Sequence, residues 1–239
     1  MIRALRFLFA VKVLTLWYGG RVFTNAWRGV RHQPGGVYDE ICREWGVKMM
    51  RWNRLRATVE GLDRLVPGQP YVYVANHASF VDIWTLLVHL PGSIRFVYKK
   101  ELGSIPVFGP AIRASGHIAI DRQNRASAFS AYDVAAGDVR GGTSAMVFAE
   151  GRRSADGRLM TFKKGPFVLA IAAGVPVVPV AVLGTFESLP KGSIAPRQVP
   201  ISIRIGAPIH TEGLTYEDRD AVSRQCRLEL EALGVPPGD

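Results

Sequence analysis

A histidine and an aspartate follow a short β-rich run of the chain. His77 and Asp82 come shortly after Tyr71–Ala75 and are five residues apart. Five residues of an α-helix rotate about 500° and leave two side chains about 140° apart, so the pair cannot share one face of a continuous helix. The side chains can meet if His77 lies in a loop and Asp82 in the first turn of a helix. Asp82 would then hold one ring nitrogen, and the other could take a proton from a substrate hydroxyl.

The same stretch also has a purely structural interpretation. Ser79 followed three residues later by Asp82 fits a capping box, which begins a helix. On this interpretation His77 is an incidental loop residue beside a helix cap. A single His-x4-Asp pattern does not decide between the two interpretations.

Adjacent arginines follow another β-rich run. In Phe148–Ser154 (FAEGRRS), Gly151 lets the backbone turn sharply. Arg152 and Arg153 supply forked donors that suit phosphate oxygens. Glu150 could orient one of these guanidinium groups. The segment therefore indicates a site for a phosphate group.

Two more basic clusters lie at the ends of predicted elements. Gly116–Arg122 (GHIAIDR) is a strand pattern that ends in an arginine, and Phe162–Pro166 (FKKGP) places two lysines before a proline that can begin a helix. Each cluster alone is typical of a solvated strand end or a surface ion pair. Three basic clusters in one chain, together with the His/Asp pair, favour an anion-binding active site.

The elements that must position these residues alternate between strand and helix. Strands are predicted at 56–60, 71–75, 94–98, 117–120, 145–148, 177–183 and 201–205. Helices are predicted at 39–54, 83–90, 107–114, 125–139, 166–173 and 216–233. This alternation predicts an α/β fold with a mostly parallel central sheet flanked by helices. Ligands of such sheets bind beyond the carboxyl ends of the strands, where the His/Asp pair and the arginines fall.

Composition narrows the classes of partner. The chain has 239 residues, and 30 Lys and Arg against 20 Asp and Glu give a net charge of +10. An anionic partner is expected, either a nucleic acid, a membrane surface or a phosphorylated substrate. A hydrophobic content of 48% excludes disorder. The two distant cysteines, Cys42 and Cys226, exclude a disulfide scaffold and fit a reducing compartment.

Much of the positive charge lies near the N-terminus. Six Lys and Arg residues precede Asp39, the first acidic residue, and are interleaved with aromatic and aliphatic side chains. On an unbroken helix the five arginines fall within an arc of about 80°, although Gly19-Gly20 is a candidate interruption. Lys12 splits the apolar run, so no stretch reaches the ~18 uncharged residues of a spanning helix. No cleavage site of a removable signal peptide follows.

This N-terminal pattern predicts amphipathic helices over residues 1–54 that lie in the membrane interface. Their arginines would face anionic head groups, and their aromatic side chains would enter the lipid boundary. The alternative is an N-terminal helix pair that packs on the domain. An α/β domain is predicted over residues 55–239.

The four blocks of sequence resemble the phospholipid/glycerol acyltransferase family. Its signature is N-H-x-S-x-x-D, then G-x-I-x-I-D-R, F-P-E-G-T-R-S and V-P-(V/I)-(V/I)-P-V. The corresponding blocks here, in the same order, are Asn76–Asp82, Gly116–Arg122, Phe148–Ser154 and Val175–Val180. The match covers residues 55–182. The bacterial lysophosphatidic acid acyltransferases, which share F-K-K-G, look most similar, and the resemblance implies a glycerol-phosphate acyltransferase-like fold.

The resemblance also implies a reaction. A fatty acyl group would move from acyl-CoA or acyl-carrier protein to the free hydroxyl of 1-acyl-glycerol-3-phosphate, giving phosphatidic acid for phospholipid biosynthesis. His77 would be the general base and Asp82 its partner. No cofactor or metal is implied, because the thioester is a substrate. The implied partners are a membrane surface with anionic lipid, the two substrates and acyl-carrier protein, with no nucleic acid. The implied location is a monotopic attachment to the cytoplasmic face of the cell membrane.

Further residues receive roles from the resemblance alone. Those implied at the acceptor-phosphate site, or supporting it, are Arg153, Glu150, Gly151, Arg122, Arg152 and, as a weaker correspondence, Lys100. Asn76 and Ser79 belong to the signature around the catalytic pair.

Three positions depart from the family pattern. Ala149 stands where the family usually has proline, and Arg152 replaces threonine with a cation that strengthens phosphate binding or faces solvent. His117 is atypical in the second block. Because no acid lies at a matching distance, we interpret His117 as a strand residue and not as a second base. These departures leave glycerol-3-phosphate or another lysophospholipid open as the acceptor.

Two other classes of protein compete with a transferase. A nucleic-acid-binding module should gather its arginines in one patch with exposed aromatic residues, whereas here they divide between the N-terminus and the strand ends. A lipid or thioester hydrolase could use the same His/Asp pair to activate water. The sequence has no G-x-S-x-G, HExxH, P-loop or G-x-G-x-x-G pattern, so no covalent acyl-enzyme, metal or dinucleotide is expected.

Overall fold

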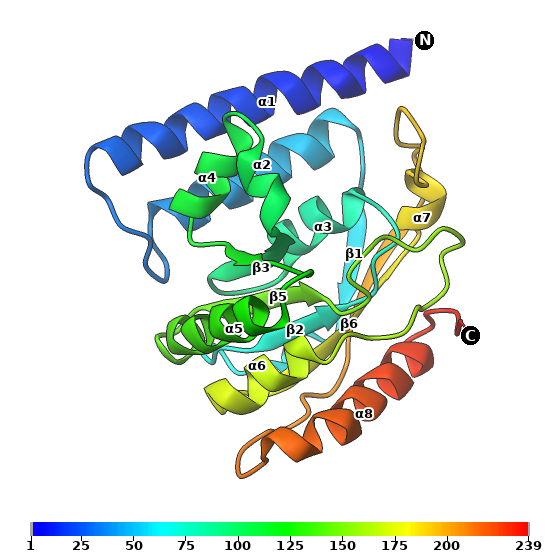
Figure 1. Ribbon diagram of the computed structural model, residues 1–239. Helices are drawn as coiled ribbons and strands as arrows, with labels where there is room; N and C mark the ends of the chain where they lie inside the picture. Colours follow the sequence, from blue (N-terminus) through cyan, green and yellow to red (C-terminus); the bar gives the residue numbers. More distant parts are fainter. Residues whose placement is uncertain (1, 239) are drawn as a thin grey trace.

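Seven strands form one central sheet within residues 2–238, the part of the chain that the computed structural model describes (Figure 1). They are β1 (Ala57–Glu60), β2 (Val72–Ala75), β3 (Ile94–Lys99), β4 (Ile118–Ile120), β5 (Ser144–Phe148), β6 (Val177–Leu183) and β7 (Ile201–Ile205). Their order across the sheet is β1-β7-β6-β2-β5-β3-β4, and only the β6–β7 pair is antiparallel. The prediction of a mostly parallel sheet is confirmed.

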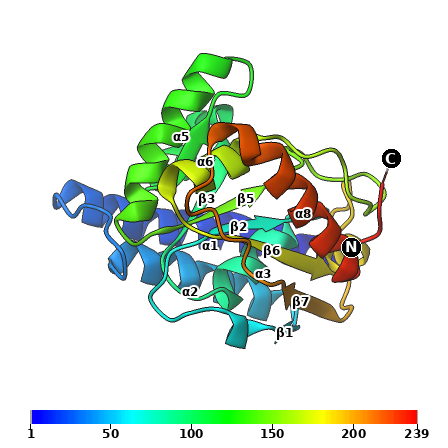
Figure 2. The same ribbon diagram turned by 90° about the horizontal axis from the view of Figure 1, so that it is seen from below.

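Helices cover both faces of this sheet (Figures 1 and 2). On one face lie α1 (Ile2–Trp27), α2 (Val37–Trp52), α3 (Val81–His89) and α4 (Phe108–Ala114). On the other lie α5 (Arg125–Arg140), α6 (Gly165–Ala173) and α8 (Arg219–Ala232). The short helical turns are η1 (Leu62–Arg64), η2 (Lys100–Ser104), α7 (Thr185–Ser188) and η3 (Tyr216–Asp218).

The central strands are apolar on both sides because both sides are covered. In β2, Val72 and Val74 pack into the core beneath α5, α6 and α8, while Tyr73 and Ala75 pack into the core on the opposite face. All four side chains are buried. Continuous apolar strands of this kind are what a parallel sheet between two helical layers requires. The strand ends at the carboxyl edge of the sheet are therefore held in fixed positions by packing on both faces.

The two N-terminal helices share their core with the α/β layer. Phe7 of α1 packs with Met49 of α2 and Trp84 of α3, and Tyr18 of α1 packs in a second cluster with Ala111 of α4. Residues 1–54 thus form no separate core within the described chain. The helix pair packed on the domain, the alternative in the sequence, describes their position.

The helix α1 is unbroken, so the interruption considered at Gly19-Gly20 is wrong. Gly19 instead allows close packing, because a Cβ at this position would lie 2.8 Å from Cγ1 of Val107, beside α4. The glycine therefore brings two helices together without ending either one.

Several N-terminal arginines bind the protein itself. Arg3 and Arg6 donate to the carbonyl groups of Pro196 and Trp52, each at 2.9 Å, and Arg21 pairs with Glu44. These three arginines thus have partners within the protein, which the charge pattern of the sequence did not predict. Guanidinium groups at the flank of α1 satisfy carbonyl groups at helix and loop ends, which fixes α1 on the domain.

The outward face of α1 is apolar instead. The large apolar side chains of α1 that are exposed, with exposed fractions from 37% to 88%, are Leu5, Leu8, Phe9, Val13, Leu16, Trp17, Phe23 and Trp27, and Lys12 is exposed among them. Exposed apolar side chains that gather along one helix are typical of interaction sites. Among residues 2–238, no helix combines the length and the hydropathy needed to cross a bilayer.

Candidate active site

The predicted polar residues meet at the carboxyl edge of the sheet. The segments after β2 and β5 adjoin because these strands are parallel neighbours, with Ala75 opposite Phe148. β3 links β5 to β4, so the segment after β4 reaches the same edge. Parallel pairing therefore gathers side chains that are more than 70 residues apart in sequence.

His77 and Asp82 are in contact. His77 lies in the loop after β2, Asp82 in the first turn of α3, and Nδ1 of His77 is 2.8 Å from Oδ2 of Asp82. Asp82 is fully buried, whereas the His77 side chain keeps 14% exposure. Since the carboxylate accepts the Nδ1 proton, Nε2 is the nitrogen that can take a proton from a ligand. The predicted pairing is confirmed by this geometry.

The helix-cap interpretation is also partly correct. Oδ2 of Asp82 accepts the backbone N–H groups of Ala78 and Ser79, each at 2.9 Å. The hydroxyl of Ser79 accepts the N–H of Val81 and donates to the carbonyl of Leu189. One carboxylate oxygen therefore holds both the loop that precedes α3 and the imidazole, while the Ser79 hydroxyl satisfies the first N–H of the helix.

Asn76 ties this loop to the neighbouring strand. Its side-chain amide donates to the carbonyl of Val182 at 2.9 Å and accepts the N–H of Val182 at 2.8 Å. Asn76 is buried, and this paired bond replaces the ladder contact that β2 loses where it ends. The His77 loop therefore leaves the sheet from a fixed point.

The ring of His77 is also held by an aromatic neighbour. The rings of His77 and Phe148 stack with centroids 3.8 Å apart and an angle of 12° between planes. Phe148 is the last residue of β5, so β5 positions the imidazole from one side while Asp82 anchors it from the other. The sequence motifs did not predict this role for Phe148. The feature of the sequence that could have indicated it is the position of Phe148 at the end of a predicted strand, just before the segment with Glu150 and the two arginines.

Glu150 is not placed as a phosphate ligand, which corrects the expected role. It is 4% exposed, and its two oxygens accept the N–H groups of His77 at 2.7 Å and Met160 at 2.9 Å. Burial raises the pKa of Glu150 to about 7, partly offset by the two backbone N–H groups. A carboxylate whose oxygens are occupied in this way positions the loop that carries His77, whereas an acidic oxygen beside a phosphate would repel the phosphate.

Gly151 and Arg122 form a link between two strand ends. Gly151 has φ of +74°, a left-handed conformation that glycine adopts without strain. Its carbonyl oxygen accepts a hydrogen bond from the guanidinium of Arg122. This places Arg122 beside the segment after β5, as the sequence predicted for a supporting residue. Arg152, next in the chain, is exposed.

Arg153 lines the same cavity as His77 and feels the charge of Asp82. Its guanidinium sits 3.9 Å above the ring of Phe80, a stacking contact that holds a cation without satisfying its N–H donors. Burial lowers the pKa of Arg153, and the charge of Asp82 partly offsets this effect. The donors of Arg153 thus remain available to an anion beside His77.

Lys100 is not brought to the site. It lies in η2, its side chain is 66% exposed, and Nζ is 3.4 Å from Oδ2 of Asp121. It is absent from the residues that line the cavities in the described structure. Its correspondence to a phosphate-binding lysine of the family therefore gains no structural support.

A cavity of about 460 Å³ adjoins His77. Its walls are apolar side chains of α1, α2, α3, β3 and α4, among them Tyr18, Ile41, Trp45, Leu87, Phe96 and Ala111. Arg122 and Arg153 line the same cavity. An apolar chamber beside a polar site suits a ligand with a hydrocarbon part and a charged part.

Two titratable side chains in this apolar cavity are neutral. Burial lowers the pKa of His117 to about 3 and raises the pKa of Cys42 to about 11. His117 precedes β4, its Nδ1 accepts the N–H of Phe96 at 3.0 Å, and Nε2 is 3.8 Å from the Cys42 sulfur. His117 therefore serves packing and accepts a backbone N–H group. It lies one residue before β4 and not within a strand as expected, and its neutral, buried imidazole is consistent with the interpretation that it is no second base. Within residues 2–238, no group of three His, Cys, Asp or Glu residues could hold a metal ion.

The fold and the site together define a class: α/β proteins in which a His–Asp pair at the sheet edge lies between an apolar cavity and arginine side chains. The chain belongs to the Acyltransferase family, whose sequence model matches residues 56–183.

Individual relatives agree with this membership. The chain is 36% identical to the 1-acyl-sn-glycerol-3-phosphate acyltransferase of Limnanthes douglasii, over 89% of this chain and 75% of that protein. It is 33% identical to the Cocos nucifera protein of the same name, over 78% of this chain and 59% of that relative's length. The crystal structure of the 1-acyl-sn-glycerophosphate acyltransferase PlsC from Thermotoga maritima is similar at a TM-score of 0.74 and 27% identity, and covers 100% of this chain and 97% of that one.

Proposed function

We propose that the protein transfers a fatty acyl group from an acyl thioester to the free hydroxyl of 1-acyl-glycerol-3-phosphate, giving phosphatidic acid. The observation that carries the proposal is the contact between His77 and Asp82 beside an apolar cavity that Arg153 also lines. The choice of acceptor rests on the relatives described above, since each is named as an acyltransferase of this acceptor. The donor is acyl-CoA or acyl-carrier protein.

In the proposed mechanism His77 first accepts a proton from the acceptor hydroxyl and then donates it to the leaving thiolate. Nε2 takes the proton of the acceptor hydroxyl as its oxygen attacks the thioester carbonyl carbon, and Asp82 stabilises the imidazolium that forms. The tetrahedral oxyanion collapses, the carbon–sulfur bond breaks, and the leaving thiolate takes the proton from Nε2. General acid–base help of this kind contributes roughly 10²–10⁴-fold. Binding the acceptor phosphate adds to the rate by orienting the hydroxyl.

The apolar cavity accommodates the acyl chain of the donor in this scheme. Burying methylene groups there contributes about 0.8 kcal/mol each, so the chain itself supplies much of the binding free energy. The charged acceptor head group is excluded from the apolar walls and stays with the arginines. The thioester carbonyl of the donor and the free hydroxyl of the acceptor thus meet at His77.

The proposal is tested with purified protein, acyl-CoA, acyl-carrier protein and a panel of acceptors, with products identified by mass. We expect a phosphatidic acid product that requires the lysophosphatidic acid acceptor. Release of free fatty acid at the same rate without any acceptor would show a hydrolase. If transfer to glycerol-3-phosphate, or to a lysophospholipid with another head group, were faster than transfer to lysophosphatidic acid, the proposed acceptor would be wrong.

Arg153→Ala is expected to raise the KM for the phosphorylated acceptor. Charge-assisted hydrogen bonds contribute about 1.5–3 kcal/mol, so the increase should be roughly 10- to 100-fold. Initial rates at varied acceptor concentration measure this effect. Arg153→Lys keeps the charge but loses the paired N–H donors of the guanidinium, so it should recover only part of the affinity for the acceptor. An unchanged acceptor KM in Arg153→Ala would remove this arginine from the phosphate site.

We further propose that the outward face of α1 lies in the membrane interface, as a monotopic attachment on the cytoplasmic side. The apolar strip from Leu5 to Trp27 supports this placement, with the free Lys and Arg of the segment adding attraction to anionic lipid. The two cysteines are free thiols, which suits a reducing compartment.

A triple variant of α1 tests the membrane placement. Leu5→Gln, Leu16→Gln and Trp27→Gln change side chains that are 61%, 48% and 88% exposed, so folding should be preserved. Losing roughly 1 kcal/mol of apolar burial at each site predicts on the order of 100-fold weaker binding to anionic vesicles in co-sedimentation. The matched control is Val134→Gln, Ile194→Gln and Leu228→Gln, which changes equally exposed apolar residues outside α1. Equal binding of both triple variants would contradict the placement.

A further inference from the structure

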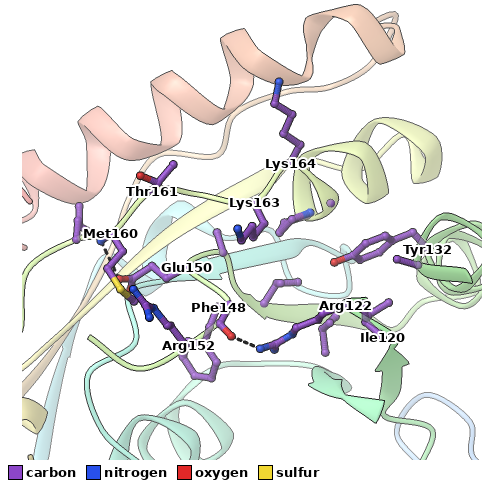
Figure 3. A pocket seen from close by; sticks show the side chains of 18 of the residues that line it. Ile120, Arg122, Tyr132, Phe148, Glu150, Arg152, Met160, Thr161, Lys163 and Lys164 are labelled. Carbon is purple, nitrogen blue, oxygen red and sulfur yellow. Dashed lines mark hydrogen bonds between the residues drawn. The ribbon is translucent and has the colours of Figure 1, made fainter. Parts of the chain in front are cut away.

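A second, larger hollow opens on the opposite face of the sheet. It has a volume of about 1300 Å³ and lies among β4, β5, α5, α6 and η3 (Figure 3). Six cationic side chains line it: Arg122, Arg152, Arg158, Lys163, Lys164 and Arg219. We call this hollow the basic groove. The proposed transfer reaction uses only its edge, where Arg122 and Arg152 lie.

The positive charge of the basic groove is only partly neutralised from within, because six cationic side chains line it and only two acidic ones, Glu150 and Asp156. Its two acidic lining residues are occupied, since Glu150 holds the His77 loop and Asp156 accepts the hydroxyl of Ser154 and the N–H of Arg158. Lys164 is paired with Asp220 of α8 at 3.0 Å, and Figure 3 shows its side chain directed toward that helix. In the described chain, no carboxylate lies within ion-pair distance of Arg152 or Lys163. These two cations are available to a ligand.

The basic groove and the apolar cavity meet at the catalytic residue. Both are lined by Val97, Arg122, Phe148, Gly151 and Arg152. Phe148 stacks on the ring of His77, so one wall of the groove is the residue that positions the base. A ligand in the groove can therefore extend past Phe148 to a reacting group at His77.

Aromatic side chains lie in the same groove. Tyr132, Phe129 and Tyr216 line it, and the guanidinium of Arg219 sits 3.8 Å above the ring of Tyr216. The residue after the two lysines is Gly165. A Cβ at this position would lie 2.4 Å from the ring of Tyr132, so the close approach of this ring requires glycine. Ring surfaces together with several cations form the combination that binds a purine base and its phosphates.

We propose that the basic groove binds the phosphorylated nucleotide part of a coenzyme A thioester, with Lys163 as one of its phosphate ligands. The inference rests on the proposed transfer reaction. The acyl chain then enters the apolar cavity, the thioester lies at His77, and the pantetheine arm passes Phe148 into the groove. A concave, cation-lined hollow fits a nucleotide, while a folded carrier protein presents a large convex surface to its partner.

The test compares acyl-CoA with the acyl thioester of pantetheine, which has the same reacting group but no phosphate or nucleotide. In Lys163→Ala, we expect the KM for acyl-CoA to rise roughly 10-fold, since one charge-assisted contact is lost. The KM for the pantetheine thioester should change less than about 2-fold. Adenosine 3′,5′-bisphosphate should compete with acyl-CoA in the unaltered protein and bind roughly 10-fold more weakly to Lys163→Ala in calorimetry.

The matched control is Arg197→Gln, which removes one exposed positive charge that does not line the groove. It should leave both KM values unchanged. An equal rise with both thioesters, a rise in the acceptor KM instead, or transfer from acyl-carrier protein but not from acyl-CoA would overturn the inference and leave the transfer reaction standing. Failure of transfer with every donor would refute the proposed function, and the calorimetric comparison would still decide whether the groove binds the nucleotide.

Discussion

His77→Ala is expected to lower kcat for acyl transfer by roughly 10²–10⁴-fold, the usual contribution of a positioned general acid–base. The KM for the acceptor should change little, because the phosphate is held by arginines and not by the imidazole. The proton that Nε2 takes would have to pass to water instead. Steady-state rates with lysophosphatidic acid and acyl-CoA measure the loss.

The structure shows how to separate lost chemistry from lost folding in this variant. Alanine at position 77 removes the ring that stacks on Phe148 and leaves the Asp82 carboxylate without one of its three partners. His77→Gln fills more of the space and can still donate to Asp82, yet it cannot act as a base, so it should be equally inactive.

A histidine outside the site provides the control. His89→Ala changes a half-buried histidine at the end of α3, the helix that carries Asp82, and the Nδ1 atom of His89 bonds to the carbonyl of Thr85 at 2.8 Å. This variant should keep full activity. Turnover within a few-fold of the unaltered protein in both His77 variants would exclude His77 as the base.

Most of the fold could be predicted because local pattern and tertiary structure agree. All seven strands lie within one residue of their expected bounds, since buried parallel strands are short apolar runs between breakers. The contact between His77 and Asp82 could also be predicted from the sequence. Their spacing permits contact only across a loop-to-helix boundary, and the strand pattern places that boundary after Ala75.

The roles of Glu150 and the N-terminal arginines could not be predicted, because both depend on contacts between distant segments. Nothing near Glu150 in sequence shows that its oxygens accept the N–H groups of His77 and Met160, which belong to different loops. The arginine at position 3 likewise binds a carbonyl of residue 196. A charge pattern along one helix cannot distinguish a cation that meets lipid from one that meets the protein.

Asp82→Asn is the variant that separates the charge of the carboxylate from its positioning role. All three hydrogen bonds to Asp82 reach Oδ2, from His77, Ala78 and Ser79, whereas Oδ1 is buried without a partner among the described residues. The amide oxygen of asparagine can therefore take the place of Oδ2 and keep all three bonds. The amide nitrogen would occupy the place of Oδ1, at a cost of about 1–3 kcal/mol for a buried donor without an acceptor.

The loss in Asp82→Asn should thus come from the missing charge. A unit charge near the imidazolium contributes about 4 kcal/mol at an effective dielectric constant of 20, so kcat should fall roughly 10²–10³-fold with the acceptor KM unchanged. Asp82→Ala also leaves the N–H groups of Ala78 and Ser79 unsatisfied, so it should lower both kcat and the melting temperature by more than Asp82→Asn does. If Asp82→Asn kept full activity while Asp82→Ala lost it, the carboxylate would act only by holding the loop before α3 and the imidazole in place. The proposed stabilisation of the imidazolium by the charge of Asp82 would then have to be abandoned.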